Sequence, residues 1–359
     1  MSFNSGNKIK FSIFGQSHSK EMGVIVEGFP AGFKPDMEKL NEFMQRRAPG
    51  KDKYSTTRKE QDIPEVVSGM NPDGTLCGSP LCMVIENSNA KSRDYDNLKL
   101  VPRPGHSDFA AYMKYNGFND IRGGGQFSGR LTAPLCAAGG IAKQILEEKG
   151  IFIGAHISSV HGIKDDSFNA TGCSTKLFEE IAKKDFPVIS DEKGLFMRAE
   201  IDRAREDKNS VGGTIECIIC GIKAGMGDFG TDSIESRLSS LAFSVPAVKG
   251  IEFGNGFECE KLYGSENNDE FYIDENGDVK TKTNNHGGIL GGISSGMPIL
   301  FKVVIKPTPS IAREQNSVNL KTKTNEVLEV SGRHDPCIVQ RAVPVFEAVA
   351  ALAILDILS

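Results

Sequence analysis

The sequence predicts one mixed α+β domain, and three observations lead to this fold class. Segments with the two-residue alternation of strands and segments with the 3.6-residue period of helices are mixed along the chain without a regular strand–helix–strand order, which argues against a doubly wound parallel sheet. The 359 residues contain no internal repeat and no linker rich in proline or serine. Hydrophobic residues make up 39% and charged residues 25%, as is typical of a globular protein with a buried core.

The N-terminal half alternates between short apolar strands and amphipathic helices. Asp36 is a typical helix N-cap residue, and the apolar residues that follow it recur on one helical face. Gly150 is a typical helix stop. The predicted elements of this half are, in order, strands at 8–14 and 22–28, a helix opening at 35–36, a strand at 81–87, and helices at 107–115 and 129–149.

The C-terminal half continues the mixture and ends in an apolar helix. Strands are predicted at 151–160 and 211–222, and helices near 174–184, 194–207 and 232–243. Residues 258–285 are polar and acidic, so we expect a mobile surface insertion within the single domain 1–359. Residues 338–358 are apolar on most helical faces, which predicts a helix in the centre of the molecule or at a subunit interface.

Charge and cysteine content argue against several classes of protein. The net charge of -5 argues against nucleic acid as a partner, although residues 46–59 are locally basic. The polar residues 1–10 carry no secretory signal, and no apolar run approaches the roughly 20 residues of a membrane helix. We therefore expect a cytoplasmic protein whose eight cysteines are free thiols. Cys217 and Cys220 lie on opposite faces of a strand, so no metal site is predicted.

Five glycine-rich polar segments interrupt the apolar periodicity. Each combines exposed backbone N–H groups with a hydroxyl, imidazole or cationic side chain, a mixture suited to phosphate groups. Neither of the standard nucleotide motifs, G-x-G-x-x-G after a strand or G-x-x-x-x-G-K-[ST], occurs. The segments are 15–19 (GQSHS), 103–108 (RPGHSD), 122–130 (RGGGQFSGR), 284–296 (NNHGGILGGISSG) with 306–310 (KPTPS), and 332–337 (GRHDPC).

Four of the six histidines lie in these segments, namely His18, His106, His286 and His334. Imidazole is the side chain best suited to proton transfer near neutral pH, so their clustering indicates a catalytic site. No G-x-S-x-G motif accompanies Ser17, which argues against a serine hydrolase.

Taken together and in this order, the five segments resemble the chorismate synthase family. The resemblance runs from Gly15 to Cys337 and includes the family patterns R-R-x-P-G, R-P-G-H-A-D and R-H-D-P-C. It implies a lyase that eliminates phosphate from 5-enolpyruvylshikimate 3-phosphate to give chorismate, with reduced FMN required and NADPH as a possible reductant. It also implies a homotetramer and a β-α-β sandwich, which we expect to have two antiparallel sheets packed centrally with helices outside.

The resemblance also implies roles for individual residues. His18 is expected to be the acid near the departing phosphate, His106 to act on the reduced flavin, and Asp335 with Ser128 to remove the ring proton. The positions that match substrate contacts are Ser17, Arg47, Lys53 and Arg130. The positions that match FMN contacts are Gln126, Phe127, Ser128, Pro246, Ala247, Gly291, Lys306, Pro307, Thr308, Pro309, Ser310 and Arg333.

The chain departs from the common family pattern after its triple glycine. The pattern there is Arg-Ser-Ser-Ala-Arg-Glu, whereas this chain has QFSGRL at 126–131. Ala48 and Lys53 also replace common arginines, and lysine lacks the bidentate fork of arginine.

Three other functions remain open at this level. A non-catalytic protein that binds phosphorylated metabolites fits the anion-binding segments but does not need several proton-transfer groups. A flavin oxidoreductase would consume NAD(P)H without the phosphate ester. An RNA-binding protein rests only on the basic loop and predicts salt-dependent binding.

Overall fold

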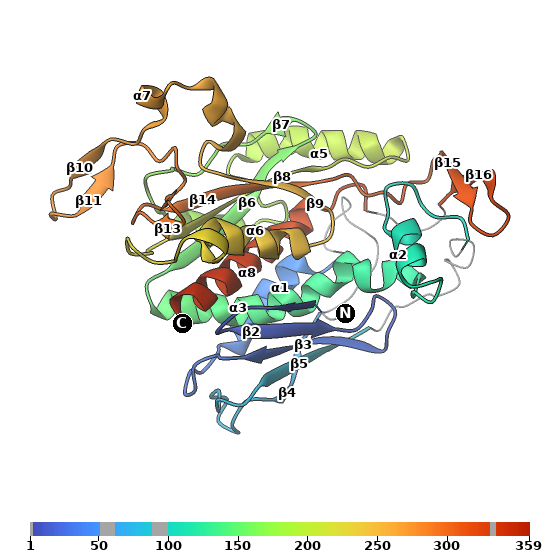
Figure 1. The fold of residues 1–359 in the computed structure, drawn as a ribbon, viewed down its shortest axis with the longest axis horizontal. Helices are drawn as coiled ribbons and strands as arrows, with labels where there is room; N and C mark the ends of the chain where they lie inside the picture. Colours follow the sequence, from blue (N-terminus) through green and yellow to red (C-terminus); the bar gives the residue numbers. More distant parts are fainter. Residues whose placement is uncertain (1–2, 51–61, 88–99, 331–334) are drawn as a thin grey trace.

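Two antiparallel sheets face each other across a layer of helices (Figure 1). The computed structural model describes residues 3–50, 62–87, 100–330 and 335–359. Within these residues each main sheet has five strands, in the orders β1-β2-β3-β5-β4 and β7-β6-β8-β14-β9. The first sheet contains β1 (Phe3–Ser5), β2 (Lys10–Phe14), β3 (Glu21–Glu27), β4 (Glu65–Ser68) and β5 (Leu81–Glu86). The second contains β6 (Phe152–Val160), β7 (Ile163–Lys164), β8 (Gly213–Cys220), β9 (Val248–Phe253) and β14 (Ile299–Ile305).

The helices divide into a central group and a peripheral group. The central group is α1 (Met37–Arg47), α3 (Thr132–Glu148), α6 (Ile234–Ser244) and α8 (Val339–Leu358). The others are α2 (Asp108–Lys114), α4 (Thr175–Ala182), α5 (Asp191–Glu206) and α7 (Gly264–Asn267). Short hairpins are formed by β10 (Phe271–Ile273) with β11 (Val279–Thr281), β12 (Ile289–Leu290) with β13 (Ile293–Ser294), and β15 (Glu314–Asn319) with β16 (Thr324–Glu329).

The fold class expected from the sequence is confirmed, but the order of layers is not the one expected. We expected the sheets to pack centrally with the helices outside, whereas α3 packs on β3 and β5 of the first sheet and α8 packs on β6 and β8 of the second. The reason is that α3 and α8 are apolar on most faces and need cover on every side. Helices α4 and α5 pack against β6 of the second sheet.

Close approach of α3 and α8 holds the central layer together. A methyl group added at Gly139 would lie 2.3 Å from Cβ of Ala348, so glycine allows the two backbones to touch. Both helices begin near the same end of the molecule, where the loops that join the layers also gather. The packing of these two helices therefore fixes the position of that end.

Most predicted elements are confirmed, with small shifts at their ends. The helix predicted from 129 begins at Thr132, because residues 129–131 form a single 3-10 turn. Strand β14 was missed, although it lies between β8 and β9 and is mostly buried. Strand β1, at the edge of the first sheet, was also missed.

The segment 258–285 is a surface extension that carries α7 and the β10–β11 hairpin (Figure 1). All three residues of β10 are exposed. That this segment is mobile, and that the chain forms a single domain, stay predictions.

The expectation that all cysteines are free thiols is wrong for one pair. A disulfide joins Cys173 to Cys220, because the loop after β7 passes over the end of β8. The expected strand geometry is confirmed, since Cys217 faces α8, with Sγ 4.0 Å from the Phe346 carbonyl oxygen, while Cys220 faces the opposite side. Within the described residues, no helix has both the length and the apolar character needed to cross a membrane.

A buried carboxylate on α8 ties the central helices together electrostatically. Glu347 accepts hydrogen bonds from Arg46 on α1 and from Lys143 on α3. The Lys143 and Glu347 side chains are both largely buried. Burial alone would raise the pKa of Glu347, but the two adjacent cations outweigh it and lower the pKa from 4.5 to about 2. Ionised Glu347 therefore stabilises the fold.

The stabilisation from Glu347 has a defined pH window. Because its pKa is lower in the folded chain, its contribution is complete above about pH 4.5 and is lost as the pH falls towards 2. We expect Glu347→Gln to lower the free energy of unfolding at pH 7 by about 3 kcal/mol. The difference from the unsubstituted protein should shrink at pH 3, as measured by urea unfolding at both pH values.

The control for this prediction is Glu258→Gln, which breaks an exposed ion pair with Lys261. It should leave unfolding nearly unchanged at both pH values. If the two substitutions lowered the free energy of unfolding equally at pH 7, the stabilisation could not come from the buried ion pairs of Glu347.

Candidate active site

A cavity of about 700 Å³ lies where the central helices begin and the two sheets are joined by loops. Its walls come from segments far apart in the sequence, including the N-terminal loop, the end of α1, the start of α3, the 306–310 loop and the start of α8. Thr132 of α3 and Ile338 before α8 both line it, so two helix N-termini, with their positive dipole ends, lie at the wall.

Most of the predicted site residues meet here. Those that line the cavity are Ser17, Arg47, His106, Gln126, Phe127, Ser128, Arg130, Pro246, Ala247, Lys306, Thr308, Pro309, Ser310 and Asp335. His18 is buried directly beside it, against Gly123. Pro307 and Gly291 are not among the lining residues, and Gly291 belongs to the turn between β12 and β13, which Figure 1 places at the other end of the molecule from α2. Lys53, Arg333 and His334 lie outside the described residues.

The triple glycine brings the N-terminal loop and His106 together. Gly123, Gly124 and Gly125 have φ values of 59°, 87° and 54°, in the left-handed region that favours glycine. A methyl group at Gly123 would lie 2.5 Å from both His18 Cε1 and Ser17 Oγ, and one at Gly124 would lie 3.2 Å from His106 Nε2. The segment thus lies between the two histidines at van der Waals distance, which requires the absence of side chains.

The N-terminal loop is fixed by backbone hydrogen bonds. The N–H of Ser17 donates to the carbonyl oxygen of Gly125 over 3.1 Å. Asn87, which follows β5, donates from Nδ2 to the carbonyl oxygens of Gln16 and Ser19 and accepts from Arg130 Nε. Asn87 therefore links the loop that carries His18 to an arginine of the cavity wall.

One buried carboxylate, Asp62, holds two of the predicted substrate arginines. It forms ion pairs with Arg47 and Arg130 through its two different oxygens, and its side chain is fully buried. Burial would raise the pKa of Asp62, but the two guanidinium groups hold it below its usual value. Arg47 also donates from Nε to Thr132 Oγ1 over 3.1 Å. The ion pairs with Asp62 and the hydrogen bond to Thr132 therefore fix the spacing between Arg47 and Arg130.

Sequence reasoning missed Asp62, Asp108 and Arg341. Asp108 pairs with Arg103 and His106, and Arg341 pairs with Asp335 through Nη1 at 3.0 Å. Asp108 lies in the segment 103–108, which was already singled out by its glycine and histidine. A carboxylate two residues after His106 was the sequence signal that could have identified it. Asp62 lies 15 residues beyond Arg47 in the sequence, so no local pattern joins them.

The 306–310 loop lies against the loop of His106. Lys306 donates from Nζ to the carbonyl oxygen of Gly105, and Arg103 donates from Nη1 to Ser310 Oγ over 3.1 Å. Burial and the nearby Lys249 lower the pKa of Lys306. The wall here offers an ammonium group and hydroxyl groups, as an anion-binding site requires.

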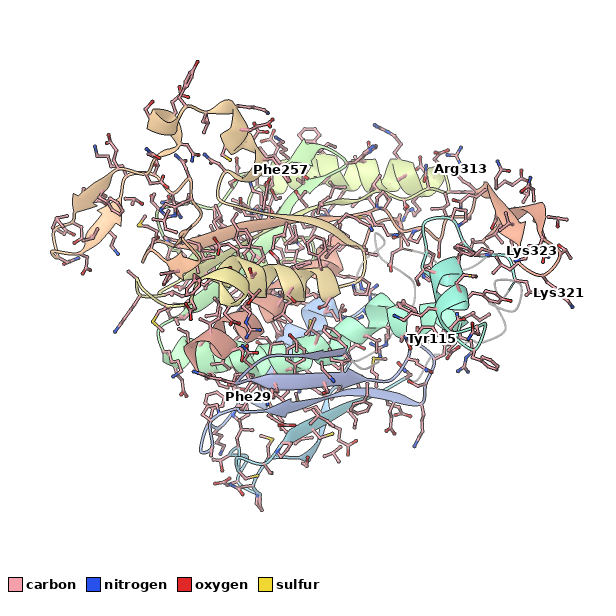
Figure 2. The ribbon with its side chains drawn as sticks, viewed as in Figure 1. Phe29, Tyr115, Phe257, Arg313, Lys321 and Lys323 are labelled. Atoms are coloured by element: carbon pink, nitrogen blue, oxygen red, sulfur yellow. A yellow bond between two sulfur atoms is a disulfide. The ribbon has the colours of Figure 1, made fainter. Side chains whose placement is uncertain are left out.

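The residues that depart from the family pattern form an aromatic edge of the cavity. Gln126 donates from Nε2 to the hydroxyl of Tyr115 over 2.8 Å, and the rings of Phe127 and Tyr115 are 6.5 Å apart. Figure 2 shows Tyr115 just beyond α2. Gln126 is thus engaged by a neighbouring side chain rather than directed away from the wall.

Comparison with known proteins decides the family. The family model for chorismate synthase matches residues 9–358. The chain is 45% identical to a chorismate synthase of Lancefieldella parvula, over 100% of this chain and 96% of the relative. It is 40% identical to one of Korarchaeum cryptofilum, over 98% and 96%. A crystal structure of chorismate synthase covers 99% of this chain and 92% of its own with a TM-score of 0.77 at 27% identity.

The chain belongs to the chorismate synthase family. The family's enzymes are phosphate lyases that convert 5-enolpyruvylshikimate 3-phosphate to chorismate in the shikimate pathway of aromatic amino acid biosynthesis. The family, reaction and enzyme class expected from the sequence are therefore confirmed.

Gly123 provides a test of the contact with His18. We expect Gly123→Ala to lower kcat/KM for chorismate formation at least about 100-fold, because the new methyl group displaces His18 and Ser17. The rate would be measured by chorismate absorbance with reduced FMN, beside the melting temperature of each variant.

Gly162→Ala is the matched control. Gly162 also has a positive φ, 83°, but no atom lies within 4 Å of the added methyl group, and it does not line the cavity. The control carries the same kind of backbone strain without displacing a side chain. An equal loss of activity in both variants would show that backbone strain, and not the contact with His18, accounts for it, and normal activity in Gly123→Ala would contradict the prediction.

Proposed function

We propose that this chain forms chorismate in the cavity described above, with reduced FMN bound beside the substrate. The observation that carries the proposal is the convergence of Arg47, Arg130 and Lys306 with His106 on one cavity. The substrate has two carboxylates and a phosphate, and the flavin adds another phosphate, so the site must concentrate cations in a chain of net charge -5.

The lining residues fit a flavin as well as the substrate. The volume of about 700 Å³ lies in the range of ligand and cofactor pockets. Phe127, Val245 and Val248 offer apolar surface, while Lys306 and Thr308 offer a cation and a hydroxyl group. When bound, reduced flavin supplies electron density for breaking the carbon–oxygen bond. We assign FMN to the walls formed by 126–128, 246–247 and 306–310.

The side chains of the wall supply the proton transfers and hold the anions. His18, packed against Gly123, protonates the departing phosphate and so lowers the cost of its charge. His106 exchanges a proton at the cavity, and Asp335, with Ser128, accepts the proton lost from the substrate ring. Arg341 orients the Asp335 carboxylate. Arg47 and Arg130, spaced by Asp62, bind the substrate anions together with Ser17.

Four further assignments rest on the family resemblance alone. Lys53 is proposed to bind substrate, and Arg333 and Gly291 to bind FMN. NADPH is proposed as a possible source of electrons, which would make the chain its own flavin reductase.

The proposed cofactor requirement is tested by an anaerobic assay. The purified protein is mixed with dithionite-reduced FMN and 5-enolpyruvylshikimate 3-phosphate, and chorismate absorbance and phosphate release are followed together. We expect equal amounts of both products and none without reduced flavin. His18→Ala, His106→Ala and Asp335→Asn should each slow turnover at least about tenfold without lowering the melting temperature by much.

Other outcomes distinguish the remaining candidates. Product formed without flavin would contradict the cofactor assignment. Binding of both ligands without product would favour an anion-binding protein, and Gln126 and Phe127 would then be the first positions to revert to the family pattern. NADPH consumed without the phosphate ester would favour a flavin oxidoreductase.

We also propose a homotetramer that works in the cytoplasm. The support is a set of large apolar side chains exposed on the surface extension and directly before it, namely Phe271 and Ile273 on β10 and Phe257, which is 79% exposed (Figure 2). Apolar side chains that gather into one exposed patch mark an interaction surface. The cytoplasmic location rests on the phosphorylated substrate, which does not cross membranes unaided.

The oligomeric state is tested by size-exclusion chromatography with light scattering. A tetramer of 38.9 kDa chains is expected. Replacing Phe271 and Ile273 by Asp should lower the mass of the assembly, because two charges would be buried in the contact. An unchanged tetramer would show that the β10–β11 hairpin lies outside the interface.

A further inference from the structure

His106, which lines the cavity, is engaged by Asp108 through its ring nitrogen Nδ1. The His106 Nδ1 atom lies 2.6 Å from Oδ1 of Asp108. The Nε2 atom lies beside Gly124, whose added methyl group would be 3.2 Å from it, and both His106 and the adjacent Gly123 line the cavity. One ring nitrogen is therefore held by Asp108, while the other lies beside the triple glycine at the cavity wall.

Asp108 is ionised, because Arg103 surrounds it with donors. The Arg103 backbone N–H and Nε donate to Oδ2 over 3.1 and 2.7 Å, and Nη2 donates to Oδ1 over 2.9 Å. Burial would raise the pKa of Asp108, but the hydrogen bonds from Arg103 and His106 hold it far below its usual value. Arg103 is in turn held by Ser310 Oγ, so the carboxylate has a fixed position.

This charge distribution decides where the imidazole proton lies. An ionised carboxylate can only accept hydrogen bonds, so a contact of 2.6 Å requires a proton on His106 Nδ1. Arg103 Nη2 also lies 3.1 Å from Nδ1, and donation from there would require Nδ1 to be bare. The shorter contact to the negative group outweighs the longer one, because a bare Nδ1 would face a carboxylate without a hydrogen between them.

We propose that Asp108 is a positioning residue that fixes His106 in the tautomer protonated at Nδ1, so that Nε2 is the single atom through which His106 exchanges a proton with the cavity. The inference rests on the proton-transfer role proposed for His106 and adds the group that makes this role possible. Arg103 keeps Asp108 ionised and oriented, and so acts one step further from the reaction.

The decisive variant is Asp108→Asn. An amide can place an N–H group towards His106 Nδ1, which stabilises the opposite tautomer and puts a hydrogen on Nε2. We expect kcat to fall at least about 100-fold while KM for the substrate changes less than about threefold. The affinity for oxidised FMN, measured by quenching of flavin fluorescence, should also change less than about threefold.

A double-mutant cycle with His106→Ala shows whether Asp108 acts through His106. Adding Asp108→Asn to His106→Ala should not lower kcat further. If Asp108→Asn lowers kcat as much in the His106→Ala background as it does with His106 present, the proposal is overturned. A normal kcat in Asp108→Asn, when His106→Ala is slow, would overturn it as well. A normal rate in His106→Ala itself would instead remove the proposed role of His106, which keeps the two failures distinct.

The chain offers a matched control in a second buried histidine–aspartate pair. His156 Nδ1 lies 3.1 Å from Asp165 Oδ2, and neither residue lines the cavity. Asp165→Asn should lower the melting temperature and leave kcat unchanged. A similar fall in kcat for both variants would show a general effect of losing a buried carboxylate and would overturn the proposal.

If Asp108→Asn does not unfold cooperatively, Asp108→Glu replaces it in the cycle. Glutamate keeps the charge beside Arg103 but moves the accepting oxygen by one methylene group. It should slow kcat several-fold with His106 present and have no effect in His106→Ala. An equal effect in both backgrounds would overturn the proposal.

Discussion

The structure depends on the direct contact between α3 and α8 in the central layer. Gly139 lets the two helices approach until a methyl group would not fit, and the sheets then cover their remaining apolar faces. Because both helices begin at the cavity, this contact also places Thr132 and Ile338 on its wall. A packing constraint in the core therefore determines where the helix N-termini reach the cavity wall.

Charge in the site follows a common arrangement, in which buried carboxylates stand beside the cations of the wall. Asp62 pairs with Arg47 and Arg130, and Asp108 pairs with Arg103 and His106. In the central layer, Glu347 pairs with cations of α1 and α3 in the same way. Cations gathered for an anionic substrate repel one another when no ligand is present. The carboxylates offset that repulsion and hold each group in one orientation. They are consequently as much a part of the site as the cations.

The triple glycine joins the two halves of the proposed proton chemistry. Its left-handed backbone allows His18 and His106 to lie against neighbouring residues of one short segment. The residues that follow and depart from the family pattern, Gln126 and Phe127, contact Tyr115. The departure from the family pattern thus lies at the aromatic edge of the cavity.

The sequence by itself determined the family, the mixed α+β class and a set of site residues most of which line the cavity, because these depend on local periodicity and on short ordered motifs. The tertiary structure decided the order of the layers, the disulfide between Cys173 and Cys220, and the roles of Asp62 and Asp108. Each of these depends on which side chain faces which across the fold. A sequence pattern shows that a helix is apolar all round or that an acid is present, but only packing shows what covers the helix and which cation the acid holds.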